Sequence, residues 1–185
     1  MNAMSGRKAR NDAGFTLIEV IVIVAILAIL AGILAPMIFS QIDEAKISRA
    51  TSDAKSINTA ILVFRKDTGQ WPNKGADCQP NLNLLHGKGI VPANLAAFGF
   101  ETSPASRISD LLEFDDNRCW PQTWKGPYLK TVTADPWGNA YFVNALKFDV
   151  NGEAVWVYSA GPNGIVDTFA GAMSTGGDDI AVRIK

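Results

Sequence analysis

The sequence predicts an α+β fold in which one long N-terminal helix packs on a small antiparallel sheet of about three strands. The helix is predicted by an apolar run from Phe15 to Phe39, followed by apolar residues at spacings of three and four as far as Phe64. The sheet is predicted by three short C-terminal runs, rich in β-branched and aromatic residues and separated by turn residues. The 185 residues suffice for this helix and one small domain.

The first part of the helix, residues 15–39, has the composition of a membrane span. It is apolar apart from one carboxylate, Glu19, and about 20 such residues cover the roughly 30 Å hydrocarbon core of a bilayer. The preceding Arg7, Lys8 and Arg10 form a basic flank, which favours a cytoplasmic N-terminus. We therefore expect a single-pass protein whose C-terminal domain is exported.

Glu19 is the most unusual residue of this span, because an unpaired carboxylate in an apolar membrane helix is costly. An ordinary secretory signal ends in a small-residue cleavage site after its apolar region, whereas here the small residue is Gly14, immediately before it. Cleavage after Gly14 would remove the basic leader and leave the helix on the mature chain, with Phe15 first. The alternative is a plain signal anchor that tolerates an acid near its interface.

The segment Gly14–Glu19, GFTLIE, resembles the N-terminal motif of type IV pilin-like proteins. The resemblance implies that residues 1–14 are a leader, that a prepilin peptidase cleaves between Gly14 and Phe15, and that the new amine of Phe15 is methylated. It also implies the type IV pilin-like fold, with a proline in the helix at the position of Pro36. This chain has Ala13 where the usual leader has a basic residue.

Filament assembly would give Glu19 its missing partner. In a bundle of staggered helices, the ammonium group at Phe15 of one subunit can neutralise Glu19 of a neighbour inside the apolar core. We therefore expect Phe15, Glu19 and Pro36 to be assembly residues, and the chain to form a homopolymer with further copies of itself.

The helix is expected to continue as an amphipathic segment over residues 40–72. Its predicted buried stripe has charged residues interspersed and consists of Ile47, Ala50, Ala54, Ile57, Ile61 and Phe64. The segment Asp67–Pro72 combines a glycine with a following proline, which predicts the end of the helix.

Residues 73–123 are rich in Gly, Pro, Asn and Ser, which predicts a variable loop region with short helices near 81–85 and 106–114. The only two cysteines of the chain, Cys78 and Cys119, lie in this region. Because an exported domain meets an oxidising compartment, we expect a disulfide between them.

Residues 124–185 are expected to form the C-terminal sheet. The block Trp124–Val143, and above all its DPWGN segment at Asp135–Asn139, resembles the major pseudopilins of type II secretion systems. We expect a structural role for DPWGN, whose proline and glycine form a turn into the first strand. The predicted strands cover residues 140–143, 154–159 and 179–184.

Between the last two strands, residues 160–179 are rich in glycine and acids, which is typical of an oxygen-ligand cation loop rather than of a core. Calcium takes about six to eight oxygens from carboxylates, amides and backbone carbonyls. The resemblance implies a calcium site here, and this chain departs from the family by Asn163 in place of an acid and by an insertion around 168–175. The alternative is a solvated turn. The expected ligands are the side chains of Asn163, Asp167, Asp178 and Asp179 and the carbonyls of Ala160 and Val166.

Several functional classes are excluded by composition. The 17 basic and 18 acidic residues give a net charge of −1, and the basic residues are scattered, so no nucleic-acid partner is expected. A single histidine, His86, and the lack of any nucleophile or phosphate-binding motif argue against an enzyme.

Two functions remain, both built on the same helix. The resemblance favours a major pseudopilin, a filament subunit in the inner membrane and periplasm that works with an assembly platform and minor pseudopilins to drive protein export across the outer membrane. A minor, initiating subunit is a variant of this interpretation. The alternative is a type IV surface pilin for adhesion, motility or extracellular contact, which the long region 73–123 favours.

Overall fold

The computed structural model describes residues 14–75, 77–114 and 119–185. The chain divides into two compact units, one that runs to Asp43 and one from Glu44 to Lys185. One helix, α1 (Leu17–Thr68), belongs to both units: its residues up to Asp43 lie in the first, and the rest is the first element of the second. The leader expected over residues 1–13 lies outside the described residues.

In the first unit, α1 exposes its apolar side chains along its whole length. None of its most apolar window is buried, and Leu17 and Ile18 expose 78% and 70% of their surface. Within the described part of the chain, α1 is the one helix long and apolar enough to cross a membrane, as predicted. It is continuous through Pro36, whose side chain is outside what the structure describes.

In the second unit, α1 buries one stripe of side chains, as its periodicity predicts. Ala50, Ala54, Ile57, Ile61 and Phe64 are all at most 2% exposed. The prediction was wrong for Ile47, which is 43% exposed because burial of the helix begins only at Ala50.

The predicted stop signal ends this helix. Gly69 has a φ of 73°, and its N–H donates to the carbonyl of Arg65 at 2.8 Å. A glycine in the left-handed region is the usual residue just beyond a helix C-terminus.

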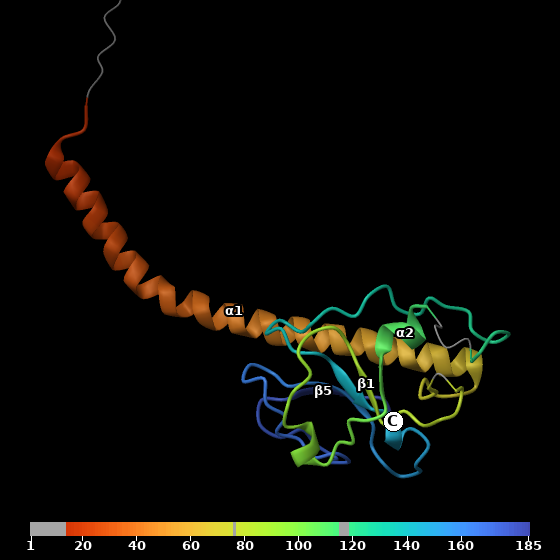
Figure 1. Cartoon of the computed structure of the whole chain (residues 1–185). Coiled ribbons are helices and arrows are strands. Elements are labelled where there is room, and N and C mark those ends of the chain that lie inside the picture. Colours follow the sequence, from red (N-terminus) through yellow and green to blue (C-terminus); the bar gives the residue numbers. More distant parts are fainter. Residues whose placement is uncertain (1–13, 76, 115–118) are drawn as a thin grey trace, which may run out of the picture. The chain divides into compact units, whose positions relative to one another are not determined.

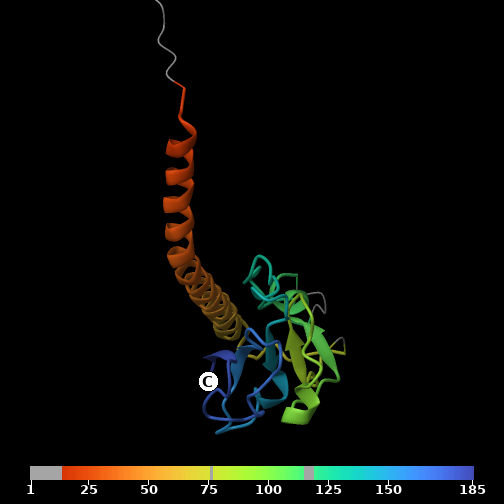
Figure 2. The same cartoon turned by 90° about the vertical axis from the view of Figure 1, so that its left-hand side faces the viewer.

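The sheet has five strands rather than about three, in the order β2-β1-β3-β4-β5. Each of the three C-terminal strands lies within or one residue beyond a predicted run, and these strands pair antiparallel. The other two strands pair parallel with each other, and β1 pairs antiparallel with β3. Figure 2 shows the strands side by side, from the green strands to the blue C-terminal one. Their bounds are β1 Leu84–His86, β2 Ala105–Arg107, β3 Phe142–Asn144, β4 Trp156–Ser159 and β5 Ile180–Arg183.

The region 73–123 therefore contains more regular structure than expected. A strand, β1, stands where a helix near 81–85 was predicted, because three residues are too few to show the alternation of a strand. The helix predicted near 106–114 is confirmed as α2 (Ile108–Leu112), and a further short 3₁₀ helix, η1, covers Leu95–Phe98. A second 3₁₀ helix, η2 (Ala145–Lys147), follows β3.

The two faces of the sheet are covered by different parts of the chain. One face presents Leu85, Val143 and Val157 to the buried stripe of α1, and α2 joins this core beside α1 (Figure 1). The opposite face presents Leu84, Phe142 and Tyr158, which are covered by η1 and the segment after it and by residues of the 160–179 loop.

The expectation that the 160–179 loop stays out of the core was wrong. Ala160 and Val166 are both fully buried in the second core. The composition of the loop did not predict these two buried residues, because an average over the whole segment does not show which single side chains point toward the core.

Cys78 and Cys119 form the predicted disulfide, with their Cα atoms 5.2 Å apart and a separation of 41 positions in the sequence. We expect the double variant Cys78→Ser, Cys119→Ser to lose about 3–4 kcal/mol of unfolding free energy, because closing a loop of this length restricts the unfolded chain. Urea unfolding of the full chain in detergent, with and without reductant, measures the loss. Reductant should leave the variant unchanged, and equal stability of the oxidised wild type and the variant would contradict the prediction.

Candidate functional site

The predicted cleavage site lies just outside the helix. Gly14, Phe15 and Thr16 precede α1 in a non-helical conformation, and all three are exposed. The N–H of Val20 donates to the carbonyl of Thr16 at 3.3 Å, so the Gly14–Phe15 bond is not part of the helical hydrogen-bond ladder. A peptidase can therefore reach this bond without unwinding α1.

Glu19 lies in the first turn of α1 and is exposed. Its N–H donates to Oγ1 of Thr16 at 3.3 Å, the first half of the capping arrangement that Thr and Glu make at this spacing. A carboxylate in the first turn also interacts favourably with the helix dipole. Among the described residues, no basic side chain forms an ion pair with Glu19. The structure therefore gives Glu19 a local role in starting the helix.

The expected cation loop brings three of its four predicted side chains together. Asn163 donates through its backbone N–H to Oδ2 of Asp178 at 3.0 Å, and through its amide Nδ2 to Oδ2 of Asp167 at 3.2 Å. Gly161 allows the close approach, because it has a φ of 63° and an added Cβ would collide with the carbonyl of Asp178. Asn163 therefore joins the two halves of the loop.

Asp179 is buried, whereas the other three residues are exposed or half-buried. Its Oδ2 accepts the N–H groups of Asp167 and Thr168 at 2.9 and 2.7 Å. Burial raises the pKa of its carboxyl above the ordinary value, although these hydrogen bonds act in the opposite direction. The other oxygen, Oδ1, is buried and has no hydrogen-bond partner within the described part of the chain.

The residues present fit a hard cation in part. Oδ1 of Asp179 is a buried carboxylate oxygen without a hydrogen-bond partner in the described structure, and a cation would satisfy it. The other candidate ligand atoms of the loop are also oxygens, which hard cations prefer. Among residues 14–75, 77–114 and 119–185, no three His, Cys, Asp or Glu side chains converge as a metal centre. A cation in this loop would therefore take part of its ligands from Asn163 and from backbone carbonyls.

The DPWGN segment has the structural geometry expected of it. Oδ1 of Asp135 accepts the N–H groups of Trp137 and Asn139 at 3.0 and 2.8 Å, which closes the turn before β3. Its Oδ2 accepts the hydroxyl of Ser159 at 2.7 Å. Since Ser159 ends β4 directly before the cation loop, Asp135 links the turn to the base of that loop.

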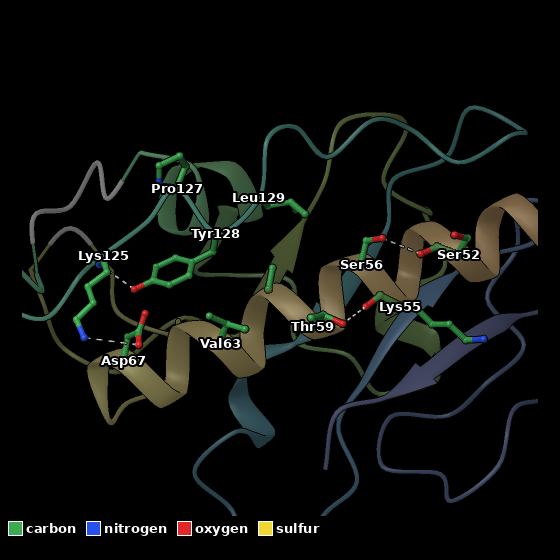
Figure 3. A pocket seen from close by; sticks show the side chains of 11 residues that line it. Ser52, Lys55, Ser56, Thr59, Val63, Asp67, Lys125, Pro127, Tyr128 and Leu129 are labelled. Carbon is green, nitrogen blue, oxygen red and sulfur yellow. Dashed lines mark hydrogen bonds and ion pairs between the residues drawn. The ribbon is translucent and has the colours of Figure 1, made fainter.

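A groove of about 660 Å³ lies between α1 and residues 125–129 (Figure 3). Two of the hydroxyls that line it, those of Ser56 and Thr59, donate to backbone carbonyls one turn earlier in α1. Asp67 pairs with Lys125 at 3.9 Å. The described residues that line the groove include no histidine or cysteine.

Comparison with known proteins identifies the family. The family model of the prokaryotic N-terminal methylation motif matches residues 9–35, and that of type II secretion system protein G matches residues 102–173. The type II secretion system core protein G of Pseudomonas aeruginosa is 30% identical over 71% of this chain and 72% of its own length. This chain belongs to the type II secretion system protein G family.

Other core proteins G match at slightly lower identity and over more of the chain. The protein of Escherichia coli is 28% identical over 88% of this chain and 90% of its own length, and that of Vibrio cholerae is 26% identical over 73% and 72%. No solved structure matches the chain. Membership of the core protein G family favours the secretion interpretation over a surface pilin.

Proposed function

We propose that this chain is the repeating subunit of a secretion pseudopilus. Prepilin peptidase cleaves after Gly14, α1 holds the subunit in the inner membrane, and the globular unit lies in the periplasm until assembly. The subunits then polymerise through α1 with an assembly platform and minor pseudopilins, and the growing filament drives protein export across the outer membrane. This role is structural and uses no catalytic group.

The observation that carries the proposal is the exposed apolar surface of α1 with Glu19 at its start. Membrane lipid can cover the apolar side chains, but it cannot neutralise the carboxylate. A second copy that brings the ammonium of its Phe15 to Glu19 would do both, because it supplies an apolar helix and the missing charge. Polymerisation is therefore favoured over the isolated subunit in the membrane.

Electron microscopy of sheared fibres, with mass spectrometry of their N-terminus, tests the proposal. The chain is expressed together with a type II secretion apparatus that lacks its own core protein G. Fibres built from chains that begin at methylated Phe15, together with restored export, are expected. Cells that retain the leader, form no fibres and restore no export would contradict the proposal.

The cation loop supports calcium as a structural cofactor of this subunit. The candidate calcium ligands are the carboxylates of Asp167, Asp178 and Asp179, the side-chain amide oxygen of Asn163 and the backbone carbonyls of Ala160 and Val166. A bound calcium ion would neutralise the carboxylates and connect the two ends of the loop. It would also offset the burial of the Asp179 carboxylate, whose Oδ1 has no partner in the described structure.

Chelation should therefore lower the melting temperature of the full chain in detergent. With calcium a hundredfold above its dissociation constant, we expect a difference of about 5–10 °C, because a ligand that binds only the folded state stabilises it. Asp178→Asn removes one charge but can still accept the N–H of Asn163, so it should abolish most of the difference.

Asp110→Asn on α2 is the matched control, since it makes the same change outside the loop. It should keep the full calcium response. A wild-type melting temperature that does not change on chelation would show that the loop is a solvated turn.

A further inference from the structure

The region 73–123 reaches the cation loop through one side chain, that of Asn94. Asparagine is a common N-cap residue because its side chain accepts the first free N–H groups of a helix. Asn94 occupies that position before η1, but it makes no side-chain cap bond. Its amide instead donates from Nδ2 to the carbonyl of Val166 at 2.8 Å, and its Oδ1 accepts the N–H of Val166 at 3.1 Å.

One side chain therefore pairs with both hydrogen-bonding groups of a residue 72 positions away. Val166 is fully buried, so either group would be expensive to leave without a partner. Only a primary amide offers a donor and an acceptor at this spacing. Aspartate would place an oxygen against the Val166 carbonyl, and an apolar residue would leave both backbone groups unpaired.

Neighbouring contacts hold the same two segments together. The carbonyl of Phe98 accepts the N–H of Ala170 at 2.9 Å, and the rings of Phe98 and Phe169 lie 4.9 Å apart. Leu95 and Val166 belong to the same buried core. Residues 94–98 thus lie against 166–170 along their whole length, and Asn94 is the polar contact at one end.

We propose that Asn94 is a positioning residue for the calcium loop, an inference that rests on the proposed function. By holding the Val166 peptide, Asn94 orients the Val166 carbonyl and sets the direction of the chain into Asp167. The N–H groups of Asp167 and Thr168, which follow directly, bind the carboxylate of Asp179. A carbonyl oxygen has two lone pairs, so the bond from Asn94 leaves one for the cation.

The contact lies at the start of the irregular segment between Val166 and Asp179, which the loop has to hold in place. A longer loop has more conformations to lose when it closes around a cation. Asn94 fixes the start of that loop before the cation binds, so calcium binding costs less conformational entropy. The region 73–123 and the 160–179 loop therefore act as one unit in this chain.

Calcium titration of the full chain in detergent, together with hydrogen exchange of the Val166 amide, tests the proposal. Asn94→Ala should weaken calcium binding about tenfold, as expected when two hydrogen bonds no longer preorganise the loop. It should also accelerate exchange at Val166 in chelator. Asn83→Ala is the matched control, because it removes two side-chain hydrogen bonds of the same region, to Glu101 and to the carbonyl of Ser103, and none to the loop.

The outcomes separate this proposal from the proposed function. Asn94→Ala with unchanged calcium affinity and unchanged exchange at Val166 would overturn the role of Asn94 and leave the calcium site intact. A wild type that does not bind calcium would overturn the calcium site itself. If Asn94→Ala fails to fold, hydrogen exchange of the Val166 amide in the wild type still tests the proposal. An amide that exchanges freely in chelator would show that Asn94 does not hold it.

Discussion

The Glu19→Ala chain should form no filaments although its globular unit remains folded. In the filament, the ammonium of Phe15 from a neighbouring subunit is expected to meet Glu19 in an apolar environment. Removal of one partner of a buried ion pair typically costs about 3–5 kcal/mol, because the other charge stays buried without compensation. This cost recurs at every subunit contact, so we expect polymerisation to fail altogether rather than to weaken.

Glu19 also helps to start α1, and the experiment has to separate the two roles. The N–H of Glu19 is bonded to Thr16 at the helix start, and glutamine can replace glutamate in this arrangement. Glu19→Gln therefore keeps the local hydrogen bonding and removes only the charge. If the charge is the assembly contact, both variants should lack filaments.

Electron microscopy of sheared material measures filament formation in both variants. Mass spectrometry checks that Phe15 is still the first residue, so that a processing defect is not mistaken for an assembly defect. Filaments of normal abundance from Glu19→Gln would show that the charge is not required, and filaments from Glu19→Ala would refute the assembly role.

The sequence predicted the parts of the fold whose signal extends over many residues. The apolar run is continuous over many residues, and the stripe from Ala50 to Phe64 in α1 repeats one period for several turns; the structure confirms both. The three C-terminal strands were found because turn residues separate them. Strands β1 and β2 were missed, since each has only three residues and their stability comes from pairing with strands far away in the sequence.

The cation loop was predictable in its residue types but not in its contacts. Oxygen-bearing side chains at Asn163, Asp167 and Asp178 do lie together, whereas the neighbouring Asp179 turns inward to the N–H groups of the loop. Adjacent residues commonly point in different directions, and composition cannot show which. The contact of Asn94 with Val166 could not be predicted from the sequence, because it depends on how the region 73–123 folds back over the sheet.

Phe64→Ala should cause the largest loss of stability, about 3–5 kcal/mol of unfolding free energy for the globular unit. Phe64 is fully buried in α1, and its ring makes edge contacts with Trp120 and Tyr128 at centroid distances of 4.8 and 5.4 Å. These two residues belong to the segment that follows the disulfide. Phe64 therefore attaches the helix to that segment, and its removal leaves a cavity where they meet.

Val63→Ala is the matched control on the preceding residue of the same helix. Val63 is 42% exposed and lines the open groove of Figure 3, so its truncation should change stability by no more than about 0.5 kcal/mol. A difference between the two variants then reports burial rather than a change in helix propensity.

Urea unfolding of the full chain in detergent, followed by tryptophan fluorescence, measures both variants. All five tryptophans lie beyond residue 44, so the signal comes from the globular unit and not from the membrane segment. A total stability of about 5–15 kcal/mol is usual for such a domain, and the Phe64→Ala chain should then be close to unfolding at physiological temperature. It should lose its fluorescence transition and its filaments together, whereas Glu19→Ala loses filaments alone. Equal unfolding midpoints for Phe64→Ala and Val63→Ala would show that the contact between α1 and the segment after the disulfide does not stabilise the fold.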